Sequence, residues 1–218
     1  MKNIPRLFID QKLKTGEQLV LSPEQFHYLN DVMRTNRFLA FNDGTEFNAE
    51  IVNKSSFTVL DSTTHIDSSG GFTFCFAPIK RTEDLVSGIT QMGAKILQPV
   101  ITERTTAHHV NWNRMRKIII ENSEQSGRNS IPDLREPITF AELAKENIIY
   151  GDERKLNHST NIILPANRGL LIGPEGGFSD SEFASLDSAG AIGVSLGKTI
   201  LRAEVAAVAL CAAYATKN

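Results

Sequence analysis

Two glycine-rich turns carry the clearest chemical potential in this sequence. One reads GPEGG at 173–177 and follows the apolar run GLLI, and the other reads LGK at 196–198 and follows AIGVS. Ligands of α/β proteins bind at the carboxyl ends of strands, and glycine lets backbone N–H and C=O groups come close to a ligand. Each turn alone is equally well explained as a tight chain reversal. Both together, each leading into a helix, favour a nucleotide-like ligand.

The spacing of these glycines argues against two common phosphate-binding loops. Residues 173–177 read G-x-x-G-G, whereas a dinucleotide-binding turn reads G-x-G-x-x-G. The run GVSLGKT at 193–199 ends like a P-loop, but that motif needs its first glycine at 192, where isoleucine stands. An ATPase or GTPase is therefore not supported.

The other polar and sulfur-containing residues suggest neither a metal site nor a membrane protein. None of the five histidines stands at a spacing typical of zinc ligands. The two cysteines, Cys75 and Cys211, lie in apolar runs, which favours buried reduced thiols over a disulfide. Charges interrupt every apolar run in residues 1–20, and no stretch approaches the roughly 18 apolar residues that a spanning helix needs. We expect a cytoplasmic protein without a bound metal.

The elements that must position the turns fall into two parts. Residues 1–67 alternate short apolar runs with turn signals, and Asp43-Gly44 between two such runs predicts a hairpin. Ser22 followed by Gln25 predicts the start of one helix. This part is expected to form a small β-barrel with a helical insertion. A run of small residues at 68–71 marks the boundary, so we predict domains at 1–69 and 70–218.

The second part has the pattern of a mostly parallel sheet covered by helices. Buried-strand runs alternate with helical patterns, which is typical of an α/β domain. Asn111 and Ser179 are predicted helix N-caps, and Gly127 is a predicted helix end. A short helix is expected in AELAKE at 141–146. The expected strands are FTFCFA, ILQPVI, NIIYGD, NIIL at 161–164, GLLIG and AIGVSL.

Motifs along nearly the whole chain resemble one family, the RsmE-type RNA methyltransferases of the SPOUT class. They are RLFID at 6–10, HYLNDVMR at 27–34, ITERT at 101–105, EQSGRNSIP at 124–132, LLIGPEGGFSDSEF at 170–183 and VSLGKTILRAEVAA at 194–207. The resemblance implies methylation of the N3 atom of a uridine in small-subunit (16S) ribosomal RNA. It also implies an N-terminal PUA-like β-barrel that binds RNA and a C-terminal α/β domain with a trefoil knot. A homodimer with S-adenosylmethionine bound in the knot would follow.

The resemblance also assigns roles to individual residues. The expected cofactor-binding residues are Gly173, Glu175, Gly176, Leu196, Gly197 and Leu201. The expected catalytic residues are Arg128, Arg202 and Glu204, and the expected RNA contacts are Arg6, His27, Arg34 and Arg37. A positive charge near N3 would stabilise the uracil anion, and Glu204 would orient Arg202 or accept a proton. Alternatively, Glu204 and Arg202 only pair on a helix surface, and Glu175 only satisfies a nearby backbone turn.

The sequence departs from the family pattern at four positions. The family usually has arginine where Thr199 stands, threonine where Val205 stands, and lysine and glutamate where Gly88 and Gln91 stand. Gly88 also weakens a helix interior by about 1 kcal/mol relative to alanine. Two alternatives therefore stay open. One is a SPOUT methyltransferase that acts on another RNA nucleotide, and the other is a non-catalytic RNA-binding factor of ribosome assembly.

Overall fold

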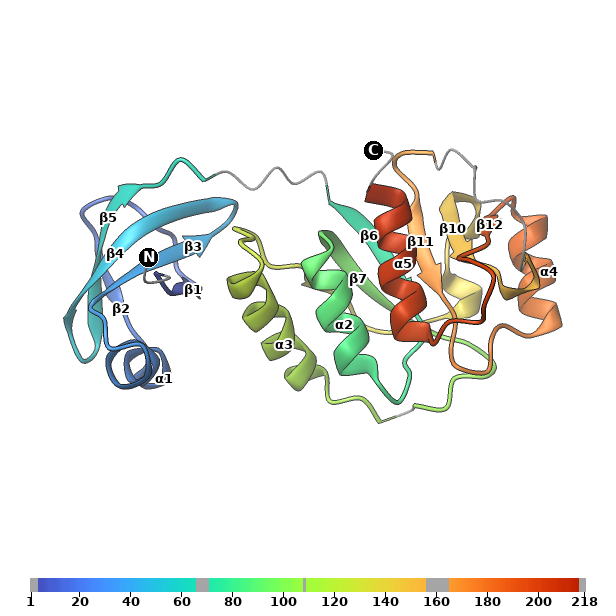
Figure 1. Ribbon diagram of the computed structural model, residues 1–218, viewed down its shortest axis with the longest axis horizontal. Helices are drawn as coiled ribbons and strands as arrows, with labels where there is room; N and C mark the ends of the chain where they lie inside the picture. Colours follow the sequence, from blue (N-terminus) through green and yellow to red (C-terminus); the bar gives the residue numbers. More distant parts are fainter. Residues whose placement is uncertain (1–3, 66–70, 108, 156–164, 216–218) are drawn as a thin grey trace. The chain divides into compact units, whose positions relative to one another are not determined.

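The structure, a computed structural model, describes residues 4–65, 71–107, 109–155 and 165–215. The chain forms two compact units, one of residues 1–68 with 120–131 and the other of residues 69–119 with 132–218. Figure 1 shows the elements of each unit. The predicted domains at 1–69 and 70–218 differ from this division in segment 120–131, which packs with the first unit.

The first unit is built on a five-stranded sheet with the order β1-β3-β4-β5-β2. Its β1–β3 pair is parallel and its other pairs are antiparallel. The predicted hairpin is confirmed between β3 and β4, where Asp43 and Gly44 both have positive φ angles of 53° and 80°, as a type I′ turn requires. The strands are β1 (Arg6–Phe8), β2 (Gln18–Val20), β3 (Arg37–Asn42), β4 (Thr45–Asn53) and β5 (Ser56–Ser62).

One helical insertion interrupts these strands, as predicted. Ser22 and Gln25 form the expected capping box at the start of α1 (Pro23–His27). The helix continues into a π-helical turn, η1 (Tyr28–Val32), and Leu29 of this turn is fully buried among the sheet side chains. Phe38 and Phe57 meet edge to face in the same core, with ring centroids 5.2 Å apart.

Segment 120–131 is fastened to the first unit by Arg6. The guanidinium donates to the backbone oxygens of Ser123, Glu124 and Arg128 and to the side-chain oxygen of Asn129 at 2.6–3.2 Å. Its Nε donates to Glu46 at 2.7 Å. All five donor hydrogens of Arg6 are therefore used within the unit. These contacts favour a structural role for Arg6 within the unit, and its RNA contact stays a prediction.

The second unit is built on a parallel sheet with the order β12-β10-β11-β6-β7-β8, and β9 pairs with β7. The predicted parallel sheet is confirmed. Central strand β6 buries Phe74, Cys75 and Phe76 together, as expected when helices cover both faces. The predicted strand at 161–164 lies outside the described residues. The strands are β6 (Phe72–Phe76), β7 (Ala94–Ile101), β8 (Asp133–Leu134), β9 (Ile138–Thr139), β10 (Ile148–Gly151), β11 (Gly169–Ile172) and β12 (Ile192–Val194).

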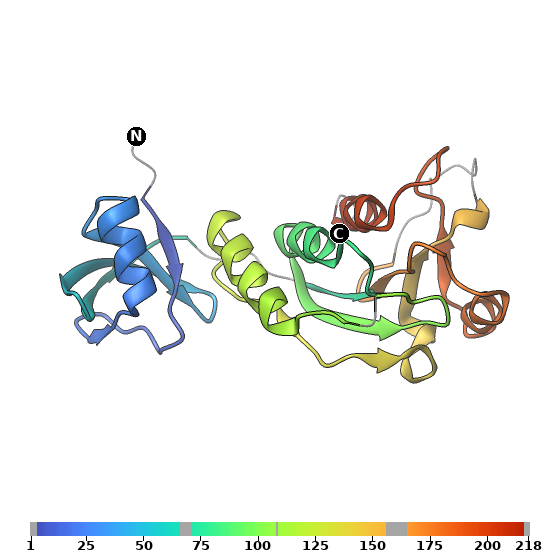
Figure 2. The ribbon, with the colours of Figure 1, turned by 90° about the horizontal axis from the view of Figure 1, so that it is seen from below.

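Helices cover both faces of this sheet. Helices α2 (Thr82–Gln91) and α5 (Ala203–Ala215) lie side by side on one face, and α4 (Asp180–Ser188) lies on the other (Figure 2). Gly88 is the point of close approach between α2 and α5, because a Cβ there would lie 2.7 Å from Cγ2 of Val208. In the part of the chain that the structure describes, no helix is long and apolar enough to cross a membrane.

Local signals predicted most helix ends correctly. Asn111 caps α3 (Trp112–Gln125) by accepting from the N–H of Arg114 at 3.0 Å, and Gly127 beyond the helix has a φ of 76°. The predicted helix at 141–146 is wrong. Two short 3-10 turns replace it, η2 (Phe140–Glu142) and η3 (Lys145–Asn147), because the intervening Leu143 adopts an extended backbone and is buried.

Candidate functional site

A cavity of about 640 Å³ opens in the second unit at the carboxyl ends of β6, β10, β11 and β12. Both glycine-rich turns contribute walls to it, as the sequence suggested. Of the six predicted cofactor residues, all but Gly197 line the cavity. The lining residues are Lys80, Arg81, Gly151, Asp152, Glu153, Ile172, Gly173, Pro174, Glu175, Gly176, Gly177, Phe178, Leu196, Thr199, Ile200, Leu201, Arg202, Ala203, Glu204 and Ala206.

Contacts from distant segments fix the first wall, the turn at 173–177. Arg104 donates through Nη1 to the backbone oxygens of Gly176 and Phe178 at 3.1 and 3.2 Å. The Glu175 carboxylate accepts from the N–H of Lys80 at 2.8 Å. It therefore satisfies a neighbouring backbone segment, which was the alternative to a cofactor-binding role in the sequence analysis. Gly173 lies against the ring of Phe178, where an added Cβ would be 3.0 Å from ring carbons. A larger residue would therefore displace the ring or the turn.

The second wall is the turn after β12. Ser195 stabilises it, since its Oγ donates to the oxygen of Gly197 at 3.2 Å and accepts from the N–H of Gly197 at 3.4 Å. The φ of Gly197 is 137°, a value that favours glycine. Leu196 covers the end of β10, because a Cβ on Gly151 would lie 3.2 Å from its Cδ1. Gly151 thus permits the second wall to lie directly on β10.

Arg202 and Glu204 both line the cavity, but they do not pair with each other. Glu204 is mostly buried and accepts from Arg81 at 2.9 Å, while Arg81 also binds Asp84 at 2.6 Å. The Arg202 side chain is exposed and has no hydrogen-bond or ion-pair partner within the described residues. Arg81, rather than Arg202, therefore holds Glu204. Sequence reasoning missed Arg81, although its place shortly after the strand FTFCFA was a signal for it.

The remaining predicted site residues lie in the first unit. Arg128 is buried there and donates through Nε to the oxygen of Ser130 at 3.4 Å. It is not among the residues that line the cavity, so its catalytic role stays a prediction. His27 pairs with Asp31 at 2.6 Å, and Arg37 lies 3.7 Å from Glu50. Arg34 is exposed and follows the π-helical turn with a φ of 52°.

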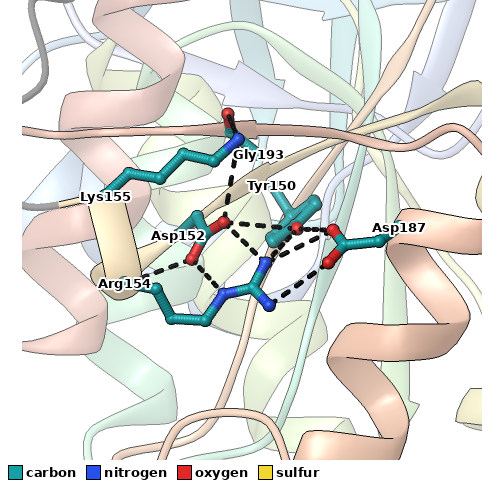
Figure 3. A network of polar contacts seen from close by, with 6 residues as sticks. All are labelled: Tyr150, Asp152, Arg154, Lys155, Asp187 and Gly193. Carbon is teal, nitrogen blue, oxygen red and sulfur yellow. Dashed lines mark hydrogen bonds and ion pairs between the residues drawn. The ribbon is translucent and has the colours of Figure 1, made fainter.

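A polar network that sequence reasoning missed lies beside the cavity (Figure 3). It joins Asp152 to Tyr150, Arg154, Lys155 and Asp187. Burial alone would raise the pKa of Asp152, but hydrogen bonds and charge from Arg154 hold this pKa below its ordinary value. Burial, together with the hydrogen bond to Asp187 and the charge of Asp152, raises the pKa of Tyr150. At neutral pH the cluster therefore contains charged carboxylates and a neutral phenol.

Other chemistry is less well supported by the described residues. Across residues 4–65, 71–107, 109–155 and 165–215, no group of three or more His, Cys, Asp or Glu is arranged to hold a metal ion. Cys75 and Cys211 are free and buried, as predicted. Burial raises the pKa of each thiol to about 12, so both are unreactive near neutral pH.

The cavity suits an adenosine-type cofactor. Its volume lies in the usual range of small-molecule sites, about 300–1,000 Å³. Glycine turns expose backbone groups on two sides, and Ile172, Leu196 and Leu201 supply apolar surface. The carboxylates of Glu153 and Glu204 supply negative charge that suits a cationic group. Nothing in this arrangement excludes S-adenosylmethionine by size or charge.

A parallel α/β sheet with two glycine-rich turns meeting at its carboxyl edge defines an α/β domain with a nucleotide-type cavity. Residues 70–215 match the family described as the RNA methyltransferase domain, and the chain belongs to that family. The predicted family and the SPOUT fold class are confirmed. Residues 156–164, between β10 and β11, lie outside the described part.

Similar proteins are known along the full length. The chain is 29% identical to ribosomal RNA small subunit methyltransferase E of Rickettsia conorii, over 93% of this chain and 91% of that protein. It resembles the crystal structure of ribosomal RNA small subunit methyltransferase E from Neisseria gonorrhoeae bound to S-adenosyl methionine, with a TM-score of 0.86, 25% identity and 98% of both chains covered. It also resembles a putative methyltransferase from Legionella pneumophila in complex with the cofactor SAM, with a TM-score of 0.85, 26% identity and 98% of both chains covered.

Proposed function

We propose that this protein transfers a methyl group from S-adenosylmethionine to the N3 atom of a uridine in 16S ribosomal RNA of the small subunit. The main supporting observation is that both glycine-rich turns wall one cavity, in a chain that belongs to the RNA methyltransferase family. A relative named ribosomal RNA small subunit methyltransferase E supports the substrate, and two similar solved structures that carry S-adenosylmethionine support the cofactor.

The chain's own residues bind and align the reactants. S-adenosylmethionine supplies a methyl group on a sulfonium that is its own leaving group, so no protein nucleophile is needed. Backbone groups of the turns at 173–177 and 196–197 hold the adenosine part. Glu175 and Arg104 keep the first turn in place, so that alignment contributes to the rate.

Arg202 is the residue placed to assist the target base. Its unpaired guanidinium at the cavity lining can stabilise negative charge on uracil as the N3 proton leaves, or hold a neighbouring phosphate. Glu204 is engaged by Arg81, which favours fixing the start of α5 over accepting a proton. Arg128 remains a second candidate for the base, and His27, Arg34 and Arg37 remain the candidate RNA contacts of the first unit.

Methyl transfer with labelled S-adenosylmethionine tests the proposed function. Immature and complete small subunits are the substrates, and the modified position is mapped by reverse transcription, because a methyl on N3 blocks base pairing and stops the polymerase. Arg202→Ala is expected to lower kcat about a hundredfold with cofactor Kd within threefold. Arg135→Ala, which removes an exposed arginine outside the cavity lining, is the matched control. Equal losses of kcat and cofactor affinity would contradict the role of Arg202.

The same assays separate the alternative functions. A stop at another nucleotide would indicate a SPOUT enzyme with a different target. RNA binding without methyl transfer, and unchanged by Arg202→Ala, would indicate a non-catalytic assembly factor. Calorimetry that detects no S-adenosylmethionine binding at millimolar ligand would remove the basis of any methyltransferase function.

We also propose a cytoplasmic homodimer. Support comes from three exposed apolar side chains at and near the start of α5: Ile200, Val205 and Val208 are 78%, 49% and 37% exposed. A second copy would cover them with apolar groups, as expected where exposed apolar side chains mark an interaction site. Ile200→Lys is expected to shift the mass in sedimentation equilibrium from dimer to monomer. A wild-type monomer at micromolar concentration would refute the proposal.

A further inference from the structure

A set of charged and polar side chains connects three elements around the cavity. We call it the Asp152 network and define it as Tyr150, Asp152, Arg154, Lys155 and Asp187 (Figure 3). Only Asp152 of this set is among the residues that line the cavity. The others can act on the cavity only through the backbone that they hold.

Asp152 is a buried carboxylate that depends on Arg154. Its side chain is fully buried, and an uncompensated buried charge is strongly unfavourable. Arg154 donates through Nε to Oδ1 at 2.9 Å and through Nη2 to Oδ2 at 2.8 Å. The N–H of Arg154 adds a third bond to Oδ1 at 3.1 Å. This bidentate pairing fixes the backbone conformation just after β10.

Arg154 also connects this segment to α4. Its guanidinium donates to Asp187 at 3.2 and 3.3 Å and lies 3.9 Å from the ring centre of Phe183. Tyr150 donates to the same Asp187 at 2.8 Å. Figure 3 shows the guanidinium between the two carboxylates. The end of β10 is therefore anchored on α4, on the side away from α5.

The network reaches the second wall of the cavity through β12. Lys155 donates to the oxygen of Gly193 at 2.9 Å, and the N–H of Asp152 donates to the oxygen of Val194 at 2.9 Å. Gly193 leaves no space for a side chain, since a Cβ would lie 2.6 Å from Oδ2 of Asp152. Three residues after Gly193 the chain reaches Leu196, which covers Gly151. The network thus holds both Gly151–Glu153 and the turn at 196–197.

We propose that the Asp152 network sets the affinity for the methyl donor through the backbone that it holds, with Arg154 and Asp187, which do not line the cavity, as positioning residues. The proposal rests on the proposed function, because it assigns the cavity to S-adenosylmethionine. Arg154 and Asp187 are 41% and 53% exposed, and ion pairs of such exposure contribute little to stability. Loss of Arg154 would instead remove the bidentate partner of the Asp152 charge, leaving Tyr150 at 3.3 Å and Lys155 at 3.9 Å, and would release the wall that follows β10.

The test compares S-adenosylmethionine binding by calorimetry with methyl transfer at saturating cofactor, using the full chain. Arg154→Met is expected to raise the Kd and the cofactor KM about tenfold, with kcat within twofold. The double variant Asp152→Asn/Arg154→Met removes the buried charge as well and is expected to recover a Kd within threefold of wild type. Arg135→Met, at an exposed arginine whose side chain pairs with Asp133, is the matched control and is expected to leave Kd unchanged.

The outcomes separate this proposal from the proposed function. Wild-type protein that does not bind S-adenosylmethionine would refute both. If wild type binds S-adenosylmethionine and Arg154→Met binds it with the same Kd, only the network proposal is refuted. A lower kcat of Arg154→Met at an unchanged KM would also refute it, because that result indicates a smaller folded fraction. If Arg154→Met does not fold, Asp187→Asn keeps the buried pair and removes the α4 anchor. It is expected to raise Kd about threefold, and an unchanged Kd would refute the proposal.

Discussion

Glu124 provides a quantitative test of how the end of α3 packs in the first unit. Its Oε1 accepts from the N–H of Phe8 at 3.0 Å. Burial raises the pKa of this carboxyl from 4.5 to about 7; the Phe8 N–H and the charge of Arg6 oppose the increase, and the charge of Glu121 adds to it. We therefore expect Glu124 to be protonated in the folded protein at pH 5 and ionised at pH 8.

The sign of the effect on stability follows from proton binding. Between pH 4.5 and about 7 the folded state holds a proton on Glu124 that the unfolded state has lost, so the free energy of unfolding falls as the pH rises through this window. Each pKa unit corresponds to about 1.4 kcal/mol, which gives about 3 kcal/mol as an upper value. Because solvent reaches part of the side chain, we expect about 1–2 kcal/mol.

Glu124→Gln keeps an oxygen for the N–H of Phe8 and removes the titrating group. The free energy of unfolding of the variant is expected to exceed that of wild type by about 1–2 kcal/mol at pH 8 and to equal it at pH 5. Urea unfolding followed by the fluorescence of Trp112, the single tryptophan, reports on the same helix. Glu136→Gln, at an exposed glutamate that does not act on Glu124, is the matched control. Parallel pH profiles for wild type and Glu124→Gln would show that the reasoning is wrong.

Two further predictions concern α2 and its contacts. Gly88→Ala is expected to destabilise the protein by about 1 kcal/mol, because overpacking against Val208 exceeds the helix-propensity gain of about 1 kcal/mol. Adding Val208→Ala should remove this overpacking, as measured by denaturant unfolding. Strictly additive effects of the two substitutions would contradict the contact. Arg81→Met is expected to lower methyl transfer about fivefold, since an ion pair like that with Glu204 contributes up to about 1 kcal/mol. Asp84→Asn, which removes only the other partner of Arg81, should change the rate less than twofold, and equal effects would refute the assignment.

The features that sequence predicted correctly depend on neighbouring residues. The capping boxes Ser22–Gln25 and Ser179–Glu182 and the Asp43-Gly44 turn are fixed by positions at most three residues apart. Local chemistry determines such elements almost regardless of tertiary context. At 141–146 tertiary burial of Leu143 decided the backbone instead, and helical propensity gave the wrong answer.

The meeting of the two glycine-rich turns was also predictable, because parallel strands bring their carboxyl ends to one edge of a sheet. The charged partners around that edge were not. Arg81 and Glu204 are 123 positions apart, and Arg154 and Asp187 are 33 positions apart. Arg6, whose partners are 40 to 123 positions away, looked like an RNA contact for the same reason. Side-chain pairing over such separations follows from the packed fold and not from spacing.

The four departures from the family pattern divide by their place in the structure. Gly88 packs against Val208 where α2 and α5 approach, so a longer side chain at 88 would need a different residue at 208. Gln91 is exposed and bonds Ser87 of its own helix. Val205 is exposed on α5. Only Thr199 both lines the cavity and faces solvent. A change at this position alters the charge that an RNA meets at the cavity while the two glycine-rich turns and their supporting contacts stay the same. Thr199 is therefore the departure that we expect to affect function, whereas Gly88, Gln91 and Val205 lie outside the cavity lining.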